Sequence, residues 1–283
     1  MPLLLPILPL LAQVGPFTNP KDGAAFPERP ARPAAAPELA PEAATPAVRD
    51  CAEAVEADPD GALDLARSWL ARARGREAAE AQMCIGLAQS RLEDWDSAER
   101  AFTAGRDGAG SDRLLRARLG SMAGSAALAG AAPARALAAL DIAAADARGL
   151  ASPALEGGIA LDRARALVAL KRDGEAREAL AEARAAAPGN AEGWLLSATL
   201  ARRQGRLGEA QAHILKAAEL VPVDPEIGLE AGVIAVLSGH EAAARKSWQS
   251  VIAAAPESPA AEIARGYLAQ LGPGRVPETP ARP

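Results

Sequence analysis

Histidine, cysteine and aromatic residues are scarce in this sequence of 283 residues, which has two histidines, two cysteines and 3% aromatic residues. His213 and His240 give a histidine-rich metal site or a Ser-His-Asp triad few starting points. His240 and Glu241 match the opening of a zinc-protease helix, but Ala244 stands where the second histidine ligand belongs. The glycines between residues 105 and 110 lack the Lys-Ser/Thr pair of a phosphate-binding loop. We therefore find no candidate metal, cofactor or catalytic site, and we expect the protein not to be an enzyme.

An excess of positive charge is also missing. The formal net charge of −5 and the isoelectric point near 5.3 argue against a general nucleic-acid-binding protein. Two arginine runs lack the interleaved aromatic side chains that a groove for single-stranded nucleic acid uses, so we interpret them as solvated helix faces. These runs are Arg72, Arg74 and Arg76, and Arg113, Arg116 and Arg118.

The apolar N-terminal segment, residues 1–12, is too short to cross a bilayer, because a transmembrane helix needs about 20 apolar residues. It is rich in leucine and ends at the small residue Ala12, which is typical of the apolar core of a secretory signal. Cleavage there predicts an exported, periplasmic protein with no membrane span in the mature chain. No lysine or arginine follows Met1, so a cytoplasmic protein with an apolar start is the alternative.

Proline recurs at short intervals through residues 13–44 and forbids a continuous helix there. This composition predicts a disordered or semi-rigid linker. Phe17 and Phe26 could dock on the folded part or on a partner, although isolated aromatic residues in such segments more often dock nowhere. The proline-rich end, residues 272–283, is also predicted to be disordered.

A period of 34 residues organises the C-terminal half of the chain. Four sets of residues keep this step, and several registers that agree at one period indicate a structural repeat. The sets are Pro188, Pro222 and Pro256; Ala176, Ala210 and Ala244; Leu180, Ile214 and Trp248; and Asn190, Asp224 and Ser258. One such unit cannot bury its apolar face alone, so neighbouring units must stack.

The unit from Ala191 to Asp224 resembles the tetratricopeptide repeat, a helix-turn-helix of about 34 residues. The residues that carry the resemblance are Trp194, Gly205, Ala210, Ile214, Ala217 and Pro222. The unit departs from the family pattern at Ser197 and Ala201, where leucine and tyrosine are usual. The resemblance implies an all-α fold, a right-handed α-solenoid of helix-turn-helix repeats with a C-terminal capping helix.

Further predicted helix starts extend the repeat interpretation to residues 45–271. A capping residue followed by proline recurs, as at Thr45-Pro46 and Asp224-Pro225, and apolar residues follow at helical spacing. We expect about six helix pairs and a capping helix from Pro259 to Leu271, with the third pair the least regular. The pairs span roughly 46–74, 77–106, 112–148, 153–187, 191–221 and 225–255.

Cys51 and Cys84 lie 33 residues apart, nearly one period, and each falls in the first helix of its pair. Neighbouring first helices pack side by side, so a disulfide is geometrically feasible if the Cα atoms come within about 7 Å. Such a bond would stabilise the N-terminal repeat by about 3 kcal/mol in a loop-entropy model and would agree with export. Two buried thiols are the alternative.

In the family, the first helices line a concave groove that receives a peptide or partner helix. The family's carboxylate clamp uses lysine and asparagine where this chain has Leu195 and Thr199, so we do not expect capture of a free C-terminal carboxylate. Arginines in the groove favour an apolar segment with acidic character. Alternatively, Leu229, Val233 and Leu237 pack on the capping helix. The groove positions are Leu161, Arg165, Val168, Glu192, Leu195, Thr199, Arg202, Arg203, Glu226, Leu229 and Val233, with Val236 next to them.

Taken together, these expectations predict a monomeric, non-catalytic scaffold that binds an unidentified protein or peptide and no nucleic acid. A self-associating assembly factor of the bacterial cell envelope is the second hypothesis. A concentration-dependent mass would distinguish it from the scaffold.

Overall fold

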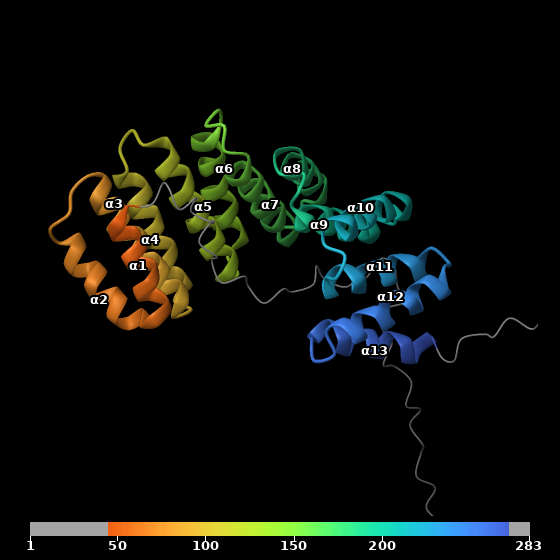
Figure 1. The fold of residues 1–283 in the computed structure, drawn as a ribbon. Coiled ribbons are helices and arrows are strands. Elements are labelled where there is room, and N and C mark those ends of the chain that lie inside the picture. Colours follow the sequence, from red (N-terminus) through yellow and green to blue (C-terminus); the bar gives the residue numbers. More distant parts are fainter. Residues whose placement is uncertain (1–44, 272–283) are drawn as a thin grey trace, which may run out of the picture. The chain divides into compact units, whose positions relative to one another are not determined.

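The computed structural model describes residues 45–271, which form thirteen α-helices (Figure 1). The first twelve form six consecutive pairs at the predicted positions, and the thirteenth is the expected last helix. The predicted signal (1–12), linker (13–44) and tail (272–283) lie outside the described residues. The helices are α1 (Pro46–Ala57), α2 (Pro59–Leu70), α3 (Arg76–Arg91), α4 (Trp95–Gly108), α5 (Arg113–Ala129), α6 (Pro133–Ala147), α7 (Pro153–Ala169), α8 (Asp173–Ala186), α9 (Ala191–Arg203), α10 (Leu207–Leu220), α11 (Pro225–Leu237), α12 (Glu241–Ala254) and α13 (Pro259–Leu271).

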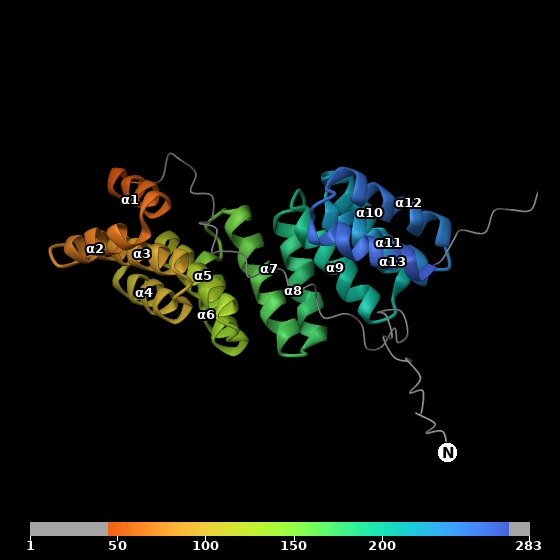
Figure 2. The ribbon, with the colours of Figure 1, turned by 90° about the horizontal axis from the view of Figure 1, so that it is seen from below.

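The described residues divide into two compact units, 45–197 and 198–271, with the boundary inside α9. In the first unit, the second helix of each pair packs on the first helix of the next pair, as α2 does on α3, α4 on α5 and α6 on α7. Figure 2 shows α5 to α8 following one another side by side. In the second unit, α10 packs on α11, and α13 packs on both α11 and α12. Both units therefore have the all-α stacking that the sequence predicts.

Side-chain caps and prolines fix where several helices begin. Thr45, Asp58, Asp224 and Ser258 each accept a hydrogen bond from the backbone N–H three positions further on, at 3.0–3.4 Å. Proline follows each of them at the first helical position, where no N–H is needed. Ser152 also precedes a proline, but its side chain does not cap α7.

Within a pair, the two helices approach closely because the first presents a small residue where the second presents a large one. The contacts of this kind are Gly86 with Phe102, Gly124 with Leu140, and Gly232 with Trp248. A Cβ atom at any of these glycines would overlap the facing side chain. Each large side chain is fully buried, so it fills the space between the helices.

The turn between the helices of five pairs contains one residue with a left-handed backbone conformation. These residues are Glu93 (φ 59°), Ala131 (φ 55°), Lys171 (φ 59°), Gly205 (φ 73°) and Gly239 (φ 80°). Glycine adopts this conformation without steric cost, whereas other residues rarely do. Successive turn residues are 38, 40, 34 and 34 positions apart. The strict 34-residue period therefore holds only in the C-terminal pairs, where the sequence displays it.

A disulfide joins α1 and α3, the first helices of the first and second pairs. Cys51 of α1 and Cys84 of α3 are bonded, and their Cα atoms are 5.9 Å apart. Both belong to a buried cluster with Val55, Leu63 and Ile85. The bond closes a loop of 33 residues, which ties the N-terminal pair to the next one.

The last helix covers the apolar side of the α11/α12 pair. The rings of Trp248 and Tyr267 have centroids 5.1 Å apart, and both side chains pack with a buried alanine cluster that includes Ala260 and Ala264 of α13. The Arg245 guanidinium donates a hydrogen bond of 3.0 Å to the backbone carbonyl of Leu271. Helix α13 thus acts as the terminal cap that a stacked repeat requires.

We predict that Gly232→Ala destabilises the second unit by about 1–3 kcal/mol, because the added methyl group must displace Trp248 in a filled core. The measurement is the urea midpoint followed by helical circular dichroism. Gly208→Ala on α10 is the matched control, since its Cβ would meet nothing within 4 Å. A loss for Gly232→Ala no larger than for Gly208→Ala would contradict the packing described.

Candidate partner-binding surface

Polar contacts connect successive first helices in the unit 45–197. The Thr45 hydroxyl, just before α1, donates to Glu80 of α3 at 3.1 Å, and Arg76 of α3 pairs with Asp112, the cap of α5, at 2.6 Å. Ser125 of α5 donates to Asp162 of α7 at 2.7 Å. Arg165 of α7 pairs with Glu192 of α9. We call this series of contacts the polar ladder.

The predicted groove residue Arg165 is held by two carboxylates, Asp162 on its own helix and Glu192 on α9. Burial alone lowers the pKa of Arg165, but the two carboxylates outweigh it and raise the pKa overall. The guanidinium is therefore permanently charged and already neutralised by two neighbours. It offers a partner little of the charge pairing that the sequence suggested.

The predicted aliphatic groove residues of this unit point into packed regions. Leu161, Val168 and Leu195 are 2%, 8% and 3% exposed. Apolar side chains with this burial contribute to the core, so a partner would find few of their atoms on the surface.

In the unit 198–271, Arg202 forms a bidentate ion pair with Glu230 of α11, with N···O distances of 2.6 and 3.3 Å. The two side chains are 7% and 10% exposed. Thr199 is also buried, whereas Arg203 and Glu226 are half-buried. The charge of Arg202 is thus neutralised by Glu230 in an ion pair between α9 and α11.

Leu229 and Val233 are partly buried and pack against the cluster that contains residues of α12 and α13, as Val236 does. For these side chains the structure has the packing on the capping helix that the sequence offered as an alternative. Whether they also contact a partner stays a prediction.

A strip of polar side chains follows the first helices of the first unit; four of its six members are partly exposed, and Glu80 and Ser121 are buried. On α5, Arg118, Ser121 and Ser125 share one helix face, because they are spaced by three and four residues. The polar ladder continues this face onto α3 and α7. We define the polar strip as Glu80, Arg118, Ser121, Ser125, Asp162 and Arg165. Sequence reasoning missed its α5 part because that pair deviates from the 34-residue period.

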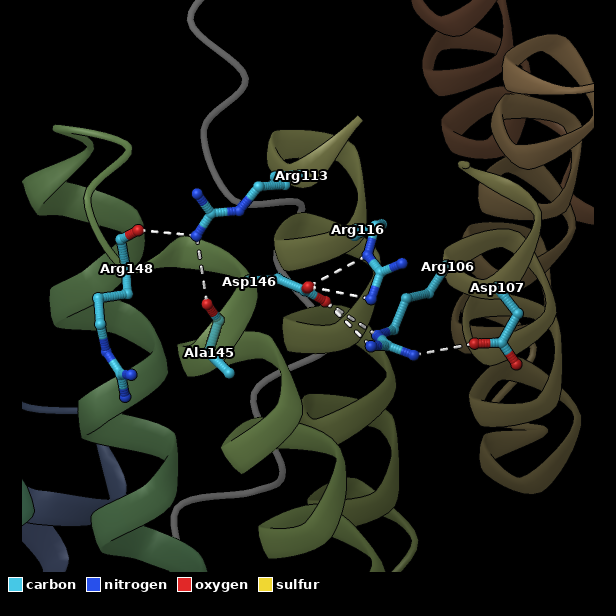
Figure 3. Close-up of polar contacts among 7 residues, drawn as sticks. All are labelled: Arg106, Asp107, Arg113, Arg116, Ala145, Asp146 and Arg148. Carbon is cyan, nitrogen blue, oxygen red and sulfur yellow. Dashed lines mark hydrogen bonds and ion pairs between the residues drawn. The ribbon is translucent and has the colours of Figure 1, made fainter. Parts of the chain in front are cut away.

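Two arginines of the predicted solvated runs, Arg113 and Arg116, contact the C-terminal end of α6 instead (Figure 3). Asp146 of α6 accepts hydrogen bonds from Arg106 of α4 and Arg116 of α5, at 3.0–3.2 Å. Arg113 donates to the carbonyl oxygens of Ala145 and Arg148 at the end of α6, at 3.4 and 2.8 Å. A cation there also complements the helix dipole. Arg113 and Arg116 are therefore structural contacts between α5 and α6 rather than a free basic face.

A cleft of about 480 Å³ lies between α10 and the α11/α12 pair, with Leu207, Leu215, Ala231 and Ala235 among its lining residues. Ala231 and Ala235 come 34 positions after Ser197 and Ala201, the sites where the repeat usually has leucine and tyrosine. Small side chains at both positions leave the space open.

At Ser197 the missing bulk is replaced by a neighbouring side chain. The Arg184 guanidinium donates to the Ser197 hydroxyl and lies over the Trp194 ring, 5.2 Å from its centroid. No comparable side chain fills the cleft beside Ala231 among the described residues.

Known structures share this arrangement of helices. The chain matches PilW, described as a widely conserved type IV pilus biogenesis factor, with a TM-score of 0.62 and 18% identity, over 78% of this chain and 99% of that one. It matches Pseudomonas aeruginosa PilF with a TM-score of 0.63 and 12% identity, over 78% and 96%. It matches YrrB, described as a TPR protein with an unusual peptide-binding site, with a TM-score of 0.51 and 16% identity, over 66% and 92%.

The chain has the tetratricopeptide-repeat fold. No protein-family model matches the sequence, and no curated protein matches it either. At 12–18% identity these neighbours establish the fold, which agrees with the resemblance seen around Trp194 and Pro222.

Two further observations describe the tetratricopeptide-repeat region itself. No helix within residues 45–271 is both long and apolar enough to span a membrane. The same residues contain no group of three or more His, Cys, Asp or Glu side chains placed to hold a metal ion.

We predict that Glu230→Ala destabilises the protein by about 3–5 kcal/mol, because it leaves the buried Arg202 guanidinium without its partner. Glu219→Ala, which removes an exposed pair with Lys216, should cost less than about 1 kcal/mol. The double variant Arg202→Met/Glu230→Leu should regain most of the loss. Urea midpoints measure all three, and equal effects of the two single variants would contradict a buried pair.

Proposed function

We propose that the protein is a non-catalytic scaffold that binds a partner protein or peptide through the polar strip of α3, α5 and α7. One observation carries this proposal: α5 and α7 are mainly apolar and buried, yet the strip places arginine, serine and aspartate side chains on one side of them. Polar groups on otherwise buried helices cost stability unless they are paired. A surface that retains them is suited to polar recognition.

The structural neighbours support this class of function without naming a partner. The description of YrrB refers to a peptide-binding site, and that of PilW to type IV pilus biogenesis. Both concern those proteins, and at 16–18% identity only the fold carries over. For this chain, an interaction role is the inference common to them.

Photo-crosslinking on the proposed surface tests the scaffold function. We would place p-benzoylphenylalanine at Leu114 or Leu128, which share the Arg118 face of α5, and at Arg177 on the exposed side of α8 as the control. A partner bound at the strip gives defined crosslinked products from the two α5 positions and none from the α8 position. Absence of crosslinks at every position in the native host would refute the scaffold proposal.

We also propose that the protein works outside the cytoplasm, in the cell envelope. The Cys51–Cys84 disulfide supports an oxidising compartment, where such bonds persist. The predicted signal at residues 1–12 supports the same location. A cytoplasmic protein with reduced thiols is the alternative.

If the protein is exported, the chain expressed with export machinery should lose about its first dozen residues and keep Cys51 and Cys84 protected from alkylation. Intact mass under non-reducing conditions, with and without an alkylating reagent, measures both. An intact Met1 end with two reactive thiols would place the protein in the cytoplasm.

Self-association as an envelope assembly factor is the second candidate. Leu65 and Val223 support it, because these large apolar side chains are 67% and 72% exposed. Single exposed apolar residues are common on monomers, so we prefer the monomeric scaffold. Sedimentation over a hundredfold range of concentration decides, since only self-association gives a rising mass.

A further inference from the structure

Arg118 is the one partly buried arginine within residues 45–271 that makes no hydrogen bond and no ion pair. Its counterparts with similar burial are all engaged, for example Arg106 and Arg116 with Asp146, and Arg163 with Asp141. A guanidinium carries five N–H donors, and leaving them unused next to protein is costly. The exception therefore needs a physical reason.

Asp112, the carboxylate that acts electrostatically on Arg118, and Glu80 of the polar ladder both accept hydrogen bonds from other donors. Asp112 accepts from the Leu115 backbone N–H with one oxygen (3.0 Å) and from Arg76 with the other (2.6 Å). Glu80 likewise accepts from Arg76 with one oxygen (2.9 Å) and from the Thr45 hydroxyl with the other (3.1 Å). Arg76 holds both carboxylates in the polar ladder, and neither forms a hydrogen bond with Arg118.

The electrostatics of the site agree with this geometry. Burial lowers the pKa of Arg118, and the charge of Arg76 lowers it further, whereas Asp112 raises it only in part. Arg165 lies on α7, the first helix of the next pair, and its two carboxylates raise its pKa. Arg118 stays charged at neutral pH, but the free protein does not supply its counterion.

We propose that Arg118 is the anchor of the partner-binding strip and pairs with an acidic side chain of an extended partner segment. This inference rests on the scaffold function proposed above. Charge complementarity selects the occupant: a carboxylate would satisfy the guanidinium with two parallel hydrogen bonds, the pairing that arginine favours. Ser125, which is partly exposed, lies two turns beyond Arg118 on the same face of α5, where a polar backbone can run; Ser121 between them is buried.

The binding test uses a fluorescein-labelled peptide of alternating glutamate and leucine, and the same peptide with glutamine for glutamate. Fluorescence anisotropy follows binding to the full chain at two salt concentrations. Arg118→Ala should weaken the glutamate peptide about tenfold, the effect of one charge-assisted contact, while the glutamine peptide binds weakly to both. Arg177→Ala on α8 is the matched control, because Arg177 is exposed and makes no ion pair.

Charge reversal makes the test specific. Arg118→Glu should lose the glutamate peptide and gain a peptide of alternating lysine and leucine. Equal weakening by Arg118→Ala and Arg177→Ala would show that the peptide responds to overall charge, and it would overturn the proposal. Failure of the glutamate peptide to bind the unaltered protein would overturn it as well.

Stability of the free protein separates an anchor from a structural arginine. Removing an uncompensated, partly buried cation should leave the urea midpoint of Arg118→Ala unchanged or raised, whereas a structural role predicts a fall. The crosslinking experiment separates this inference from the scaffold function. Crosslinks at Leu114 that persist unchanged in the Arg118→Ala background would refute the anchor and leave the scaffold standing, whereas their absence in the unaltered protein would refute the scaffold itself.

Discussion

The close approach of the two helices in the five pairs from α3/α4 to α11/α12 is the contact on which the rest of the fold depends. Glycine or alanine occurs seven residues before the turn residue, and a large side chain occurs nine residues after it. Because the small residue of the first helix leaves room that the large side chain of the second helix fills, such a pair packs tightly and its outer faces remain apolar. Within each of the two compact units those faces stack on neighbouring pairs, and in the second unit α13 closes the last one.

The polar ladder adds specificity to this apolar stacking. Buried aliphatic surfaces between helices are non-directional and tolerate sliding. The ladder contact of Ser125 with Asp162 forms at only one register, since it requires a matched donor and acceptor, and the ion pair of Arg202 with Glu230 has the same effect in the second unit. The chain uses arginine for these contacts, which suits the bidentate geometry of the guanidinium.

The sequence predicts the helices well because their signals are local. A capping residue, the proline after it and the apolar spacing all lie within one helix, as at Thr45 and Asp224. The turns at Ala131 and Lys171 are less visible, since neither residue favours the left-handed conformation it adopts. Tertiary packing imposes that conformation, and the unequal spacing of these turns hides the period in the same region.

The candidate site is predictable only in outline, because a side chain's availability depends on residues far away in sequence. Family register selects the face of Arg165, Glu192 and Arg202, but it does not reveal that Glu192 pairs with Arg165 or that Glu230 pairs with Arg202. It also does not single out Arg118, which differs from Arg165 and Arg202 in having no carboxylate at hydrogen-bond distance.

A charged side chain on a repeat surface indicates a binding site only when no ion pair within the protein already neutralises it. Arg165 and Arg118 have similar chemistry and lie on neighbouring first helices, yet one is balanced by two carboxylates and the other by none at hydrogen-bond distance. A partner that met Arg165 would have to compete with covalently tethered carboxylates at high effective concentration. At Arg118 it would meet no competitor, so the same guanidinium contributes more to affinity there. The anchor that we propose therefore depends on which partly buried cation the polar ladder leaves unpaired.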